Sequence, residues 1–113
     1  MNLTTSRAGG VVVMRVNEPR LTFPILGDFA AAITAHLSQG EHRILVDLTP
    51  VNYVDSATIG CLMDLYRQAS AAGGAFKLAG VQKRVETMLA MTGAQNFLEV
   101  HPDQASALAS FGG

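Results

Sequence analysis

The sequence lacks tryptophan and contains a single cysteine, Cys61, among its 113 residues. One thiol cannot form a disulfide within the chain, which is typical of a protein from a reducing compartment. The apolar runs are short, whereas a membrane-spanning helix needs about 20 consecutive apolar residues. The segment from Met1 to Ser6 has neither the basic nor the apolar part of a signal peptide. These absences predict a cytoplasmic protein that does not insert into a membrane.

Charge is also scarce, at 15% of residues, and the net charge is −1. The basic residues form no stripe along the chain, which argues against direct binding of nucleic acid. The three histidines fall on different segments without cysteine or carboxylate at ligand spacing, and no glycine-rich phosphate loop follows a strand. We therefore expect no metal site and no bound cofactor.

Hydrophobic residues make up 49% of the chain, enough for one compact core, and patterns typical of strands and helices alternate along it. Apolar runs predict strands near residues 3–5 and at 11–16, 43–48, 75–79 and 97–100, the first two paired. Helical spacing predicts three helices, marked by Leu26/Phe29/Ile33/Leu37, Ile59/Leu62/Met63/Tyr66/Ala69 and Val81/Val85/Met88/Leu89/Thr92, and a closing helix at Ala105/Leu108/Phe111. The stripes Leu26/Phe29/Ile33/Leu37 and Ile59/Leu62/Met63/Tyr66 are expected to face inward. The prediction is one α/β domain over residues 1–113, with a four- to five-stranded mostly parallel sheet and about four helices mainly on one face.

The junction at Asp55-Ser56 is the most informative local feature, because it lies where the 43–48 strand leads into the second helix. A serine there has two interpretations: it caps the helix by accepting hydrogen bonds from the first turn, or it accepts a phosphate. A nucleophilic serine is disfavoured because Val54 and Thr58 replace the flanking glycines of a nucleophile elbow. We therefore predict that the protein is not an enzyme.

Five further side chains carry structural expectations. Thr22 is the expected cap of the first helix, with Pro24 in its first turn. Cys61 is expected to be buried or half-buried and chemically ordinary. The methionines Met63, Met88 and Met91 are expected to fill the core and not to form a docking surface.

The Asp55-Ser56 motif resembles that of the STAS domain, and in particular the bacterial anti-sigma factor antagonists. The resemblance covers nearly the whole chain: Leu48-x-x-Val51-x-Tyr53-Val54 before the motif, Ile59-Gly60 after it, and Lys77-Leu78 and Met91-Thr92-Gly93 further on. In those antagonists a motif of Asp-Ser-(Ser/Thr)-Gly-Leu-Gly carries the serine that a partner anti-sigma factor kinase phosphorylates. The resemblance implies phosphorylation at Ser56, with a serine kinase and a serine phosphatase as partners.

This sequence departs from the family motif at Ala57 and Thr58, and Thr58 offers a second hydroxyl. The family's usual Gly-Glu-Leu-Asp segment is replaced by Pro19-Arg20-Leu21-Thr22, so we expect the cognate kinase to present an acid opposite Arg20. Both segments follow strands of a parallel sheet, whose carboxyl ends open on one edge, so we expect them to cluster. The predicted partner-binding residues are Asp55, Ser56, Thr58, Arg20, Leu21 and Thr22. The alternative is a non-phosphorylated STAS scaffold in a stress-signalling assembly or in a lipid-transport complex.

Overall fold

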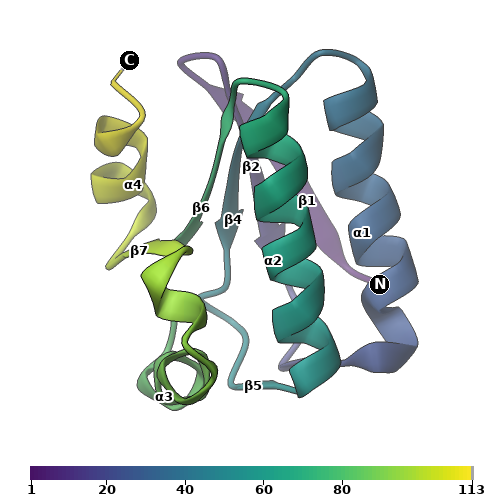
Figure 1. Cartoon of the computed structure of the whole chain (residues 1–113), viewed down its shortest axis with the longest axis vertical. Helices are drawn as coiled ribbons and strands as arrows, with labels where there is room; N and C mark the ends of the chain where they lie inside the picture. Colours follow the sequence, from purple (N-terminus) through teal and green to yellow (C-terminus); the bar gives the residue numbers. More distant parts are fainter. Residues whose placement is uncertain (113) are drawn as a thin grey trace.

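The computed structural model describes residues 1–112 as one α/β domain built on a five-stranded sheet (Figure 1). The strand order is β1-β2-β4-β6-β7, with bounds β1 Leu3–Ala8, β2 Val11–Val16, β4 Arg43–Asp47, β6 Ala75–Ala79 and β7 Glu99–His101. The β1–β2 pair is antiparallel and every other pair is parallel, which confirms the predicted mostly parallel sheet.

Four helices cover this sheet unequally. On one face lie α1 (Phe23–Ser38), α2 (Ser56–Ala71) and α3 (Lys83–Thr92), whereas α4 (Gln104–Ser110) packs on the other (Figure 1). Alternating strand residues divide accordingly: Val12 and Met14 face the large core, and Val11 and Val13 face the small one beside α4. The two stripes predicted to face inward are confirmed: Phe29, Ile33, Ile59 and Leu62 are buried, and Leu26, Leu37, Met63 and Tyr66 pack against the same core. On α3, Val85 and Leu89 are buried, but Thr92 is exposed and Val81 precedes the helix.

The predicted strand at 97–100 is displaced. Gly93 ends α3 in the left-handed region, at φ +77°, and a 3-10 helix, η1 (Ala94–Asn96), follows at once. Strand β7 therefore begins only at Glu99. Leu98 is buried, but Phe97 is 56% exposed because its backbone still belongs to the turn after η1.

A second, two-stranded sheet was not predicted. Strand β3 (Arg20–Leu21) pairs in parallel with β5 (Tyr53–Val54) beyond the carboxyl ends of β2 and β4. Two residues per strand are too few for a recognisable periodicity. This small sheet joins the segment before α1 to the segment before α2, as expected for loops that open on one edge.

Candidate functional site

The cap of α2 is Asp55 and not Ser56. Asp55 has extended backbone, and its Oδ1 accepts a hydrogen bond from the Thr58 backbone N–H at 2.9 Å. Ser56 is consequently the first helical residue, exposed, and without a hydrogen bond from its hydroxyl to any of residues 1–112. The interpretation of Ser56 as a cap is wrong, because its acidic neighbour already satisfies the first turn.

Asp55 also joins the starts of two helices. Its Oδ2 accepts from the backbone N–H of Phe23, the first residue of α1, at 2.9 Å. Thr22 does occupy the predicted cap position of α1, but its side chain makes no capping hydrogen bond. Partial burial raises the pKa of Asp55, but the hydrogen bonds from Phe23 and Thr58 outweigh it and leave the pKa below its ordinary value. The carboxylate is therefore charged and held in place at neutral pH.

Thr58 and Leu21 lie beneath the surface formed by Asp55 and Ser56 at the start of α2. Both side chains are fully buried, and the Thr58 hydroxyl lies 2.7 Å from the Leu21 carbonyl oxygen and 2.7 Å from Asp55 Oδ1. Neither side chain can touch a docked protein, so our expectation of direct partner contact does not hold for these two residues. They hold β3 against the first turn of α2 instead.

Arg20 and Thr22 lie at the same end of the domain as Asp55-Ser56, as the predicted clustering requires, because β3 pairs with β5 and the Phe23 N–H donates to Asp55. The Asn52 backbone N–H donates to the Pro19 carbonyl at 2.9 Å, and Arg20 pairs with Tyr53 across the small sheet. The Arg20 guanidinium stacks on the Tyr53 ring, 4.3 Å from its centroid. Arg20 is exposed and Thr22 half-buried, so both are accessible from the solvent.

An apolar hollow of about 140 Å³ opens directly beside Ser56, lined also by Ile59, Met88, Met91 and Thr92. Met91 is 81% exposed, so the expectation that it fills the core is wrong, whereas Met63 and Met88 are half-buried against the core as predicted. Leu89 and Ala90 precede Met91 and are apolar, so the local composition gave no signal that the Met91 side chain would face the solvent.

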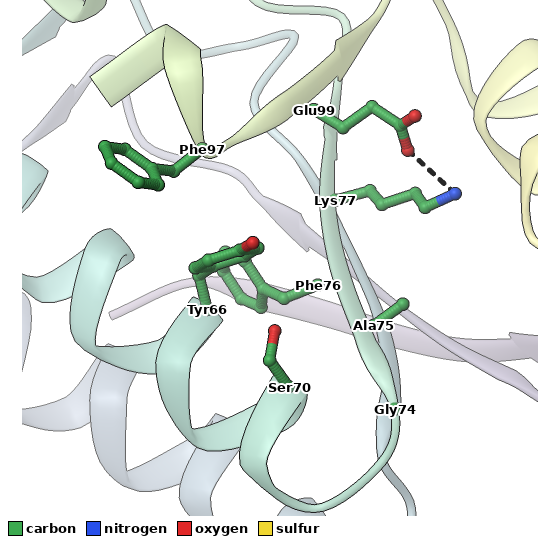
Figure 2. Close-up of a pocket in the computed structure, with 8 residues that line it drawn as sticks. All are labelled: Tyr66, Ser70, Gly74, Ala75, Phe76, Lys77, Phe97 and Glu99. Carbon is green, nitrogen blue, oxygen red and sulfur yellow. Dashed lines mark ion pairs between the residues drawn. The ribbon is translucent and has the colours of Figure 1, made fainter. Parts of the chain in front are cut away.

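Two further hollows continue from this one along α2. One, of about 230 Å³, shares Ile59 and Thr92 with the first and reaches Phe97. The next, of about 400 Å³, begins at Phe97 and reaches Tyr66 and Ser70 near the end of α2. Figure 2 shows the Phe97 ring across from Tyr66. Lys77 and Glu99 point away from these rings and form an ion pair, with 2.7 Å between Lys77 Nζ and Glu99 Oε2. We call these three hollows together the α2 groove; it begins at Ser56.

Two further polar side chains away from this surface are Asp47 and Cys61. The most buried carboxylate, Asp47, accepts from Gln104 at 2.6 Å and from the Thr49 backbone at 2.9 Å, and so fixes α4 to the sheet. Cys61 is half-buried, as expected, and burial and nearby Asp64 raise the pKa of its thiol.

Among residues 1–112, no group of three or more histidine, cysteine, aspartate or glutamate side chains could hold a metal ion. No helix in the same range has the length and apolar character needed to cross a membrane.

Comparison with known protein families matches residues 2–107 to the STAS domain. A candidate anti-sigma factor antagonist of Thermotoga neapolitana is 29% identical over 72 residues, which are 64% of this chain and 64% of that protein. The chain thus spans just under two thirds of that relative's length. A probable sulfate transporter of Arabidopsis thaliana is 27% identical over 95 residues, 74% of this chain but only 14% of the transporter.

The similar solved structures have the same fold at low sequence identity. An anti-sigma factor antagonist from Mycobacterium paratuberculosis superposes with a TM-score of 0.88 at 18% identity, covering 99% of this chain and 94% of that one. The phosphorylated form of the Bacillus cell fate determinant SpoIIAA superposes with a TM-score of 0.74 at 16% identity, covering 96% and 98%. The family match covers nearly the whole chain and the solved structures superpose over nearly all of it, and the protein belongs to the STAS domain family.

Proposed function

We propose that the protein is an anti-sigma factor antagonist that binds a kinase-type anti-sigma factor when unmodified and is switched off by phosphorylation of Ser56. The observation that carries this proposal is the contrast between two neighbouring hydroxyls. Ser56 is exposed and free of intramolecular hydrogen bonds, whereas Thr58 is 0% exposed and bonded within the fold. A kinase can reach the first without disturbing the fold, but not the second.

The proposed modification is compatible with the helix. The kinase would transfer the γ-phosphoryl group of ATP to Ser56 Oγ, with ADP leaving and the hydroxyl proton lost to solvent. Phosphate on the first helical residue meets the positive end of the helix dipole, which favours negative charge there. The modification should therefore leave α2 intact.

The modification should instead weaken docking. A phosphoserine adds about −1.5 to −2 charges at neutral pH, next to the Asp55 carboxylate. A partner that seats an apolar side chain in the hollow between Ser56 and Met91 would have to bury or displace that charge. A penalty of about 3 kcal/mol corresponds to roughly a hundredfold loss of affinity. Release of the partner would then follow from electrostatics, and a serine phosphatase would restore binding.

The similarity to anti-sigma factor antagonists supports this assignment. One structural neighbour, SpoIIAA, is known in both an unphosphorylated and a phosphorylated form with the same fold as this chain. The role we propose is binding and switching in the cytoplasm, without catalysis by this chain. Its interface includes Asp55, Ser56, Arg20 and Thr22 at the surface, positioned by Leu21 and Thr58 below.

A second candidate function is a STAS scaffold that is never phosphorylated. The match to a sulfate transporter over 14% of its length, and the fold similarity to the murine anion transporter Slc26a9 at a TM-score of 0.75, favour this alternative. Such a scaffold would use the same surface without a charge switch. Phosphate on Ser56 in the source cell separates the two functions.

The test is phosphosite mapping of the tagged full-length chain purified from its source cell, together with identification of bound proteins. We expect phosphate on Ser56, and an ATP-binding anti-sigma factor retained more strongly by Ser56→Ala than by the wild type. Ser70→Ala is the matched control, because Ser70 is an exposed serine near the other end of α2. Absence of phosphate from Ser56 under all growth conditions would contradict the switch and favour the scaffold.

A further inference from the structure

The basic side chains of the chain divide into two groups. Five contact an anion or a carbonyl oxygen: Arg7, Arg15, Arg43, Arg67 and Lys77. The other three form neither an ion pair nor a side-chain hydrogen bond with residues 1–112: Arg20, Lys83 and Arg84. All three are exposed and belong to β3 and the start of α3. Both elements contact β5, which leads directly into α2. The cations without counter-charge are thus concentrated at the end that carries Ser56.

Two of these cations share one aromatic ring. The Arg20 guanidinium lies 4.3 Å from the centroid of Tyr53, and the Arg84 guanidinium lies 5.6 Å from the same centroid. The ring attracts each guanidinium through its quadrupole, but two like charges on one ring also repel each other. An anion that contacts both would remove this repulsion, and a guanidinium can bind a carboxylate through two parallel hydrogen bonds.

The position of Arg84 is unfavourable for the helix itself. Lys83 and Arg84 are the first two residues of α3, where the helix dipole favours acids over cations. Residues that break a local rule of helix formation, with no benefit to the helix itself, are expected at functional sites. The first turn also contains one acid, Glu86, so cations are in excess there, and this excess points to a role outside the helix.

We propose that Arg20, Tyr53 and Arg84 form a recognition site for carboxylates of an acidic segment on the protein partner. The partner is inferred from charge complementarity: the chain carries a net charge of −1, yet this end presents three cations that form no ion pair, beside two acids, Asp55 and Glu86. Asp55 is held by hydrogen bonds from Phe23 and Thr58 and pairs with none of the three cations. The inference rests on the proposed function and adds to it the chemistry that the partner must present. It extends the acid expected opposite Arg20 to a site that also includes a residue of α3.

The site would also make the switch more effective. Phosphate on Ser56 places negative charge at the same end of the domain, where the partner's carboxylates must approach. The partner would then face repulsion from the phosphate, and the cations would be partly neutralised by it. Both effects weaken docking and fade with rising salt.

The test uses a decaglutamate peptide, added to the ¹⁵N-labelled full-length chain at low ionic strength and followed by NMR. We expect the Nε–Hε signals of Arg20 and Arg84 to shift with one common dissociation constant. The double variant Arg20→Gln, Arg84→Gln should bind the peptide at least about tenfold more weakly. Arg67→Gln is the matched control, an exposed arginine on α2 that already pairs with Asp64 at 2.9 Å, and should bind as the wild type does.

Equal weakening by Arg67→Gln, or no weakening in the double variant, would overturn the proposal. A decanucleotide DNA that binds the two arginines more tightly than the peptide would also overturn it, by indicating a nucleic-acid partner. Neither measurement needs the kinase, so this site can fail while phosphate is still found on Ser56. Likewise, phosphate can be absent from Ser56 while the peptide still binds at the two arginines.

Discussion

Replacement of Asp55 tests the arrangement that holds the candidate surface together. Its two carboxylate oxygens accept from different helices, Oδ1 from the Thr58 N–H and Oδ2 from the Phe23 N–H. Asparagine still caps α2 through its carbonyl oxygen, but its amide nitrogen cannot accept from Phe23. Alanine removes both interactions.

We expect Asp55→Ala to lower the free energy of unfolding by about 2 kcal/mol, of which the cap accounts for about 1. Asp55→Asn should lower it by about 1 kcal/mol, because a hydrogen bond to a partly exposed carboxylate contributes less than a buried one. Urea denaturation at pH 7 measures both values. Asp28→Ala, an exposed acid on α1, is the matched control and should change little.

The pH dependence supplies a second readout. The folded-state pKa of Asp55 is lowered from the ordinary 3.8, so its contribution is fully present above about pH 4 and is lost as the pH falls through the folded pKa. The stability difference between the wild type and Asp55→Asn should therefore shrink toward zero in acid. If Asp55→Asn is as stable as the wild type at pH 7, or as unstable as Asp55→Ala, the bridge between α1 and α2 is not as we describe it.

The remaining predictions concern the neighbouring hydroxyls and the thiol. Ser56→Ala should change the free energy of unfolding by less than about 0.5 kcal/mol, because Ser56 is exposed and caps nothing; a loss above 1 kcal/mol would contradict this. Thr58→Val should cost about 1–2 kcal/mol through loss of the buried bond to the Leu21 carbonyl, while phosphorylation of Ser56 in a kinase assay continues. Cys61 should react with a thiol reagent more slowly in the folded chain than in urea, because burial raises the pKa of its thiol. Asp64→Asn should speed the reaction of the folded chain, because Asp64 also raises this pKa; labelling at equal rates in the folded and unfolded chain would refute the prediction.

The sequence was sufficient for the sheet and the helices because their apolar patterns are long. The strand at 75–79 and the stripe through Phe29 and Ile33 lie where the periodicity places them. The 97–100 strand was displaced because Phe97-Leu98 has the composition of a strand, while the left-handed Gly93 starts a 3-10 turn that moves the strand two residues on. Local composition could not distinguish these outcomes.

The site was only partly predictable for a different reason. Asp55 and Ser56 are equally good capping residues, and the sequence does not specify which of them starts the helix. The burial of Thr58 depends on β3, a two-residue strand without a sequence signal. Arg84 joins Arg20 only because α3 lies against β5 in the folded chain, a contact between distant segments.

The central claim is that a neutral Ser56 is required for partner binding. The most direct measurement is calorimetry of the anti-sigma partner with two preparations of the full-length chain, unmodified and carrying phosphoserine at position 56. We predict that the phosphorylated chain binds at least about a hundredfold more weakly, with an unchanged circular dichroism spectrum. Equal affinity of the two preparations, or unfolding of the phosphorylated chain, would contradict the account.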